Sequence, residues 1–185
     1  MRIGVLAVQG AFAEHIAVLD KLGIESFEIR QRADIPDSFD GLVLCGGEST
    51  VMKKLLHELN LFEPLKENIQ NGMPVLATCA GMILLAEKID SGEPTCFGTM
   101  NITVKRNAYG RQLGSFRCID NFNGTPIEMP FIRAPYVTET GNNVDILSVH
   151  DDKIVAVRQG NQIATAFHPE LTDDTTVYNM FLKKI

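Results

Sequence analysis

The first half of the chain alternates between short apolar runs and segments with helical spacing. Residues 2–8 are predicted to form a strand buried on both faces, because residues 3–8 are uninterrupted by polar side chains. After the turn Gln9-Gly10, apolar residues at Phe12, Ile16 and Leu19 have the spacing of an amphipathic helix. This alternation continues to about residue 89, and it is typical of a parallel sheet covered by helices.

The expected elements of this half follow the order strand, helix, strand, strand, helix, helix, strand, helix. Their ranges are 2–8, 11–22, 24–29, 42–45, 49–58, 61–69, 74–78 and 80–89. Gly23 is expected to end the first helix, and Ser49 is the expected N-cap of the second.

The pattern changes after about residue 95, where short strand-like runs are separated by Asn and Gly turns. Strands are expected at 102–105, 114–119, 130–133, 145–149, 153–158 and 162–167, and a closing helix at 172–184. We therefore expect an α/β fold of flavodoxin-like type. Its mostly parallel central sheet is flanked by helices, with additional antiparallel or mixed strands in the second half. No linker or repeat divides the chain, so residues 1–185 are expected to form one domain.

Composition and charge exclude several classes of partner. The net charge is −6 and there is no basic run, which argues against nucleic acid. No stretch approaches the roughly 18 apolar residues of a membrane span, and the first apolar run is too short for a signal peptide. The four cysteines form no C-x-x-C pair, so we expect free thiols, a cytoplasmic location, no metal and no cofactor.

Cys79 is the strongest candidate for chemistry. It follows the apolar run 74–78 and precedes Ala80-Gly81, where a helical pattern begins. A strand that turns sharply into a helix holds a side chain out at the end of a sheet, where a substrate can reach it. The free N–H groups at the start of the helix can hold a developing oxyanion. This context favours a nucleophile over an ordinary buried cysteine, which is the interpretation of Cys45, Cys96 and Cys118.

His168 and Glu170 form a second candidate group. Pro169 disfavours helical geometry at His168, so an extended chain is expected to place both side chains on one side. Together with Cys79 they would make an activated-nucleophile arrangement. The other histidines, His15, His57 and His150, have no such context and are interpreted as surface or structural residues.

The sequence Gly46-Gly47-Glu48-Ser49 follows the strand predicted at 42–45. Two glycines allow backbone N–H groups to turn toward a bound carbonyl oxygen, although an ordinary strand-to-helix turn explains them equally well. The spacing of a phosphate-binding loop is not matched.

These motifs resemble class I (triad) glutamine amidotransferases and, more narrowly, glutaminase subunits of pyridoxal 5′-phosphate synthase. The resemblance spans nearly the whole chain in order. It rests on residues 4–10, 47–50, 105–107, 110–112, 131–135 and 168–172, and on Thr78-Cys79-Ala80-Gly81. Two positions depart from the family pattern: Cys45 stands where Pro is common, and Ala77 stands where Gly is usual.

The resemblance implies hydrolysis of L-glutamine to L-glutamate and ammonia, with ammonia delivered to a separate synthase subunit in a large hetero-oligomer. Cys79 is then the nucleophile, His168 the base and Glu170 the group that orients it. The backbone N–H groups of Gly47 and Ala80 would form the oxyanion hole. The residues implied to hold glutamine are Gly47, Glu48, Ser49, Arg106, Ile132 and Arg133.

Two other functions stay open at this point. A cysteine peptidase or γ-glutamyl hydrolase would share Cys79 and His168 but would need an open cleft. A non-catalytic docking module would have no use for the complete set of Cys79, His168 and Glu170, and that set argues against it.

Overall fold

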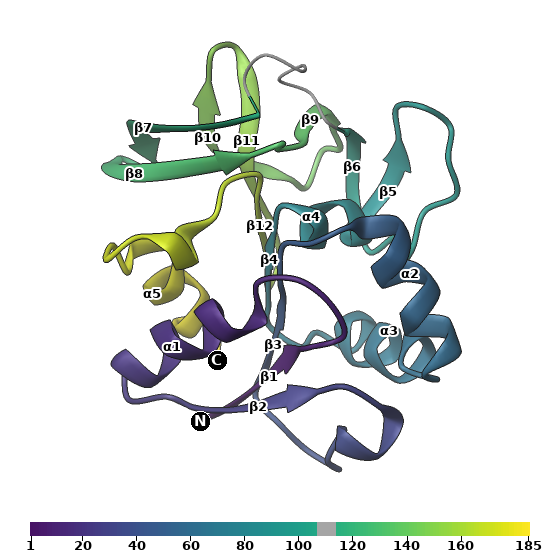
Figure 1. Cartoon of the computed structure of the whole chain (residues 1–185). Helices are drawn as coiled ribbons and strands as arrows, with labels where there is room; N and C mark the ends of the chain where they lie inside the picture. Colours follow the sequence, from purple (N-terminus) through teal and green to yellow (C-terminus); the bar gives the residue numbers. More distant parts are fainter. Residues whose placement is uncertain (107–113) are drawn as a thin grey trace.

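The computed structural model describes residues 1–106 and 114–185, which form a ten-stranded sheet and a two-stranded sheet (Figure 1). The strands are β1 (Arg2–Leu6), β2 (Glu25–Ile29), β3 (Gly41–Leu44), β4 (Val75–Thr78), β5 (Ala86–Ile89), β6 (Met100–Lys105), β7 (Ser115–Phe122), β8 (Thr125–Ile132), β9 (Tyr136–Thr140), β10 (Asp145–His150), β11 (Lys153–Gln159) and β12 (Gln162–Thr165). Asn107 and residues 110–112, which contribute to the family resemblance, lie outside the described residues.

The parallel part of the large sheet positions the site. The sheet has the order β2-β1-β3-β4-β12-β11-β9-β6-β5, and β10 pairs with β11. Strands β1, β3, β4 and β12 are neighbours and pair in parallel. Their carboxyl ends therefore meet at one edge of the sheet, which is where ligands bind in open α/β sheets.

Helices cover both faces of this parallel part. They are α1 (Phe12–Lys21), α2 (Ser49–Glu58), α3 (Phe62–Gln70), α4 (Ala80–Leu85) and α5 (Thr176–Leu182), with 3₁₀ turns η1 (Arg32–Asp34) and η2 (Pro169–Leu171). In Figure 1, α1 and α5 lie on one side of β1, β3 and β4, and α2 and α3 lie on the other. Every residue of β3 and β4 is buried, as expected for strands covered on both faces. Within the described ranges, no helix has the length and apolar character needed to cross a membrane.

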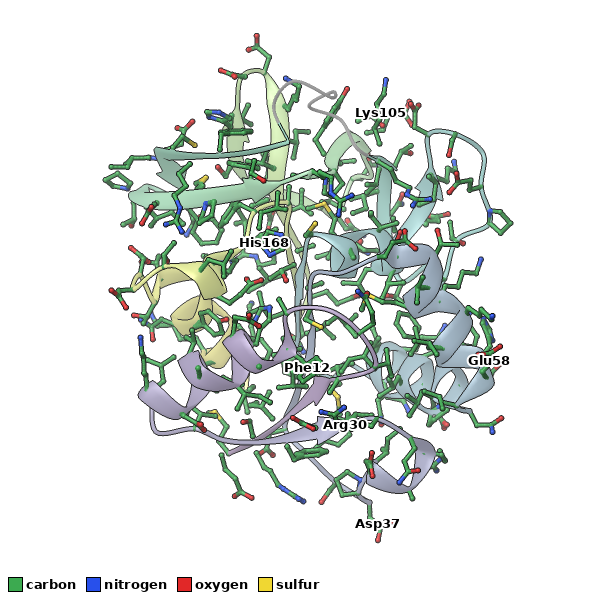
Figure 2. All side chains as sticks on the ribbon, in the orientation of Figure 1. Phe12, Arg30, Asp37, Glu58, Lys105 and His168 are labelled. Carbon is green, nitrogen blue, oxygen red and sulfur yellow. The ribbon has the colours of Figure 1, made fainter. Side chains whose placement is uncertain are left out.

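The second half adds antiparallel pairing, as the sequence predicts. Strand β11 pairs antiparallel with β12, β10 and β9, and β9 pairs antiparallel with β6. Strands β7 and β8 form a separate antiparallel hairpin. The predicted fold class is confirmed. Figure 2 shows His168 near the centre of the molecule and charged side chains such as Asp37, Glu58 and Lys105 at its edge.

Some local predictions are wrong. The helix expected over 80–89 ends at Leu85, and Ala86–Ile89 forms β5 because it pairs in parallel with β6. Strand β9 was not predicted. The closing helix covers Thr176–Leu182 only, with Asp174 accepting a hydrogen bond from the backbone N–H of Thr176 at 2.7 Å.

The N-cap of α2 is Glu48 and not Ser49. The carboxylate of Glu48 accepts hydrogen bonds from the backbone N–H groups of Thr50 (3.3 Å) and Val51 (2.9 Å). A carboxylate is favourable there because it faces the positive end of the helix. Ser49 is instead the first helical residue and is buried beside the pocket described below.

Candidate active site

Cys79 lies at a strained corner between β4 and α4. Its backbone has φ 48°, a left-handed conformation that costs energy in a residue with a side chain. The corner is held because the backbone N–H of Cys79 donates to the carbonyl of Thr165 at 2.7 Å. A Cβ on Gly81 would overlap the carbonyl oxygen of Leu44, so only glycine allows α4 to start this close to β3. The sulfur is thereby fixed at the carboxyl edge of the sheet.

His168 and Glu170 approach this corner from the chain segment that follows β12. The backbone N–H of His168 donates to the carbonyl of Pro130 at 2.8 Å. Nδ1 of His168 lies 2.6 Å from Oε1 of Glu170, and both side chains are buried. The expected extended segment is wrong beyond His168, because Pro169–Leu171 forms the 3₁₀ turn η2. The turn η2, and not an extended chain, brings the side chains of His168 and Glu170 together.

The electrostatics of this pair favour a charged imidazole. Burial alone would lower the pKa of His168, but the nearby Cys79 and the hydrogen bond and charge of Glu170 outweigh it and raise the pKa to about 10. Burial alone would raise the pKa of Glu170, yet the neighbouring His15 and His168 lower it. Nε2 of His168 is buried and forms no hydrogen bond of normal geometry with the described residues. The proton-carrying nitrogen is therefore open to a reacting group beside Cys79.

The turn at Gly46-Gly47 packs directly against this histidine. A Cβ on Gly46 would overlap Cε1 of His168 and would lie 3.4 Å from Cβ of Cys79. The carbonyl of Gly46 accepts a hydrogen bond from the backbone N–H of Ala11 at 3.0 Å, which ties this turn to the start of α1. Glycine at position 46 is thus required by the close approach of the backbone to the imidazole.

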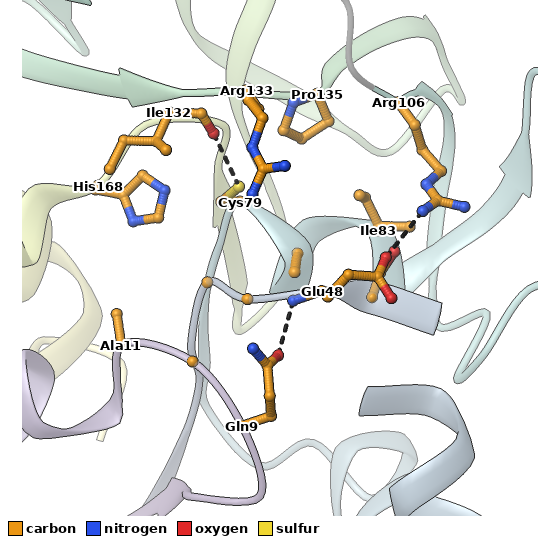
Figure 3. A pocket seen from close by; sticks show the side chains of 15 residues that line it. Gln9, Ala11, Glu48, Cys79, Ile83, Arg106, Ile132, Arg133, Pro135 and His168 are labelled. Atoms are coloured by element: carbon orange, nitrogen blue, oxygen red, sulfur yellow. Dashed lines mark hydrogen bonds and ion pairs between the residues drawn. The ribbon is translucent and has the colours of Figure 1, made fainter. Parts of the chain in front are cut away.

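A pocket of about 350 Å³ opens beside the sulfur (Figure 3). This volume is at the lower end of ligand pockets and suits a small metabolite better than a peptide. It brings together nearly all the predicted site residues, while Glu170 lies behind His168. The lining residues are Gln9, Gly10, Ala11, Gly46, Gly47, Glu48, Ser49, Cys79, Ala80, Ile83, Arg106, Ile132, Arg133, Pro135 and His168.

The two arginines of the pocket differ in their partners. Arg106 Nη1 lies 2.6 Å from a carboxylate oxygen of Glu93, and Nη2 lies 3.1 Å from Oε1 of Glu48 and 3.3 Å from Oγ1 of Thr50. Arg133 forms no ion pair with the described residues. Arg106 is thus already paired with two described carboxylates, Glu93 and Glu48, whereas Arg133 has none among the described residues.

Gln9 is a pocket residue to which the sequence analysis assigned no role. Its side-chain Oε1 accepts a hydrogen bond from the backbone N–H of Glu48 at 2.7 Å (Figure 3). Its position directly after the first strand, at the same sheet edge as Gly46 and Cys79, is the one sequence feature that could have indicated a place in the pocket. Ile83 and Pro135 also line the pocket without having been predicted.

The remaining cysteines and histidines lie outside the pocket. Burial raises the pKa of Cys45 to about 12, and its thiol donates to the carbonyl of Leu6 at 3.1 Å, so it stays protonated. His57 packs on the ring of Phe62, and His150 pairs with Asp120. Within residues 1–106 and 114–185 no group of three or more His, Cys, Asp or Glu side chains could hold a metal ion.

Comparisons with known proteins agree with this geometry. The model of the SNO glutamine amidotransferase family matches residues 5–185. A protein of Methanocorpusculum labreanum named pyridoxal 5′-phosphate synthase subunit PdxT is 56% identical over 100% of this chain and 98% of its own length. The protein of the same name from Streptococcus pneumoniae is 49% identical over 99% of this chain and 96% of its own length.

Solved structures give the same result. A crystal structure described as a glutamine amidotransferase has a TM-score of 0.92 at 38% identity, covering 98% of this chain and 97% of the other. A putative GMP synthase subunit from Thermoplasma acidophilum has a TM-score of 0.69 at 18% identity, which shows a shared fold alone. The chain is therefore an enzyme of the glutamine amidotransferase class. Within that class it belongs to the SNO glutamine amidotransferase family.

The contact between Gly46 and His168 generates a first prediction. Gly46→Ala should lower kcat/KM for glutamine by about 100-fold, because a displacement of the imidazole by about 1 Å misaligns proton transfer. Steady-state ammonia release measures this effect.

Gly41→Ala is the matched control. A Cβ there would lie 2.9 Å from Cζ of Phe181, at the opposite end of β3 from the pocket. This variant should lose about 1–3 kcal/mol of stability through overpacking and keep its kcat/KM. Normal activity in Gly46→Ala would contradict the assignment of that contact.

Proposed function

We propose that this amidotransferase acts as the glutaminase subunit of a pyridoxal 5′-phosphate synthase. It hydrolyses L-glutamine to L-glutamate and ammonia and delivers the ammonia to a synthase subunit. The observation that carries the chemistry is the buried His168–Glu170 pair, with Nδ1 and Oε1 2.6 Å apart, beside the strained corner of Cys79. The partner is supported by relatives of the same length that are named as subunits of this synthase.

In the first half of the reaction, the sulfur of Cys79 attacks the γ-carboxamide carbon of glutamine. His168 takes up the thiol proton, and Glu170 holds the imidazolium in place. The carbonyl oxygen becomes an oxyanion, for which we assign the backbone N–H groups of Gly47 and Ala80. With a pKa of about 10, His168 keeps its proton at neutral pH until the tetrahedral intermediate collapses. It then protonates the leaving nitrogen, the C–N bond breaks, and ammonia and a thioester result.

In the second half, water attacks the thioester carbon. His168, now neutral, takes a proton from this water, and the C–S bond breaks to release glutamate and regenerate Cys79. The sulfur lies 3.9 Å from the carbonyl oxygen of Ile132, so this backbone segment borders the reacting sulfur.

The polar wall of the pocket fits the free amino-acid end of glutamine. We assign the α-carboxylate to Arg133, whose guanidinium has no described carboxylate partner. We assign the α-ammonium group to the carboxylate of Glu48, which Arg106 and the N-terminus of α2 hold in position. Ser49, Gly47 and Ile132 complete the binding set. The small pocket disfavours the peptidase alternative.

The whole chain, residues 1–185, is proposed to act as one amidotransferase domain in a large hetero-oligomer. Its four cysteines are free thiols, which fits the cytoplasmic location that we propose for it.

Replacement of the nucleophile tests the chemistry. Cys79→Ala should abolish glutamine hydrolysis, with a loss of several orders of magnitude in kcat, while the fold is retained. A glutamine-mimicking alkylating reagent should label Cys79 first, as located by peptide mapping. Cys96→Ala is the matched control, since burial raises the pKa of Cys96 to about 11 and its thiol lies outside the pocket. Turnover above about a tenth of wild type in Cys79→Ala would rule out the nucleophile.

The two partner side chains should differ in effect. His168→Asn should cost more in kcat/KM than Glu170→Gln, because the imidazole moves the proton while the carboxylate only orients and stabilises it. The measurement is glutaminase activity with the synthase subunit bound. Equal or reversed losses would show that the roles are misassigned.

The partner is tested by titration with a purified synthase subunit. No side chain opposes rotation of the Gly46–Gly47 peptide plane, so docking that breaks the hydrogen bond from Ala11 to Gly46 can turn the N–H of Gly47 and complete the oxyanion hole. We expect weak activity alone and an increase in kcat of about 100-fold on binding, equivalent to roughly 2.7 kcal/mol. Full activity of the isolated chain, unchanged by a synthase subunit shown to bind it, would contradict activation by docking.

A further inference from the structure

One oxygen of Glu170 is not explained by the reaction derived above. Oε1 faces Nδ1 of His168, whereas Oε2 is fully buried and forms no hydrogen bond of normal geometry with the described residues. Nε2 of His15 lies 3.5 Å from Oε2, and both side chains are 0% exposed. A buried carboxylate is unstable as an anion without favourable groups around it. His15 is therefore placed to act on the charge of Glu170.

The ring of His15 is held at both nitrogens. Nδ1 lies 2.7 Å from the hydroxyl of Tyr178, and Nε2 lies 3.1 Å from Oγ1 of Thr78. Burial lowers the pKa of His15 and the charge of His168 lowers it further, while the charges of Glu170 and Glu14 oppose both, so the ring is neutral and carries one N–H.

The neighbours of this ring decide where the proton is. Burial raises the pKa of Tyr178, so its hydroxyl keeps its proton and can donate to Nδ1 of His15. The N–H of His15 is then on Nε2, where it faces Thr78 and Oε2 of Glu170. The opposite tautomer would point a lone pair at the carboxylate, which is unfavourable.

This contact joins four segments that are distant in sequence. His15 is on α1, Tyr178 on α5 and Glu170 in η2, while Thr78 is the last residue of β4 and precedes Cys79 directly. We propose that His15 is a positioning residue of the glutaminase reaction, holding Glu170 aligned on His168, and that Tyr178 fixes the tautomer of His15. This proposal rests on the roles assigned above to His168 and Glu170.

The positions of His15 and Tyr178 determine which kinetic parameter their loss should change. Neither His15 nor Tyr178 lines the pocket, so their loss should leave glutamine binding intact. Misalignment of the imidazole should instead lower kcat. A purely structural role would lower stability without this selective loss of kcat.

The experiment uses the chain saturated with its synthase subunit. Tyr178→Phe, which conserves volume, should lower kcat about tenfold, and His15→Leu about 30-fold, with little change in KM. His15→Gln should recover most of the loss, because the amide keeps an N–H donor for Glu170. Leu19→Val, one turn further along α1, is the control for altered packing, and its kcat should equal that of wild type.

A double-mutant cycle separates this inference from the proposed function. If His15 acts through Glu170, adding His15→Leu to Glu170→Gln should cost far less than it costs the wild type. Fully additive losses would overturn the proposal, as would an unchanged kcat in both His15→Leu and Tyr178→Phe. An active Cys79→Ala variant would instead reject the proposed function itself. If His15→Leu does not fold, the cycle is made with Tyr178→Phe.

Discussion

The parallel pairing of β4 with β12 is the constraint on which the site depends. Thr78 is in register with Thr165, and the next backbone N–H along β4, that of Cys79, donates to the carbonyl of Thr165. This single register fixes where the nucleophile corner stands relative to the chain that continues to His168. A slip of one residue would turn the side chains of one strand to the opposite face relative to the other. Strands β1 and β3 run parallel beside them and bring the Gln9 and Gly46 turns to the same edge.

The site combines strain with burial. Cys79 has an unfavourable φ, and Glu170 carries charge in the interior, so each would be unstable in isolation. Both are maintained by close neighbours: a glycine that lets the helix approach, and imidazoles that face the carboxylate. Because these neighbours come from distant segments, the geometry exists only when the whole parallel sheet is folded.

Much of the fold and of the candidate site could be predicted from the sequence, and the wrong predictions have identifiable physical causes. The apolar runs 74–78 and 42–45 predict parallel strands because a strand buried on both faces is apolar throughout. The helical pattern predicted from residue 80 extends to residue 89, whereas pairing with β6 makes Ala86–Ile89 a strand. His15 was interpreted as surface or structural, and no local pattern connects it to Tyr178, which is 163 residues away in sequence.

The pocket is built from two sheets that share no strand pairing. The large sheet supplies Cys79 and His168, whereas Ile132 ends β8 of the separate hairpin and Arg133 follows it. Part of the ligand-binding wall is therefore carried by the hairpin, while Gly47, Glu48 and Ser49 carry the rest from the side of the large sheet. A change at the end of the hairpin can reshape the rim of the pocket without touching the corner at Cys79. A change at Pro130 reaches further, because its carbonyl accepts a hydrogen bond from the backbone N–H of His168.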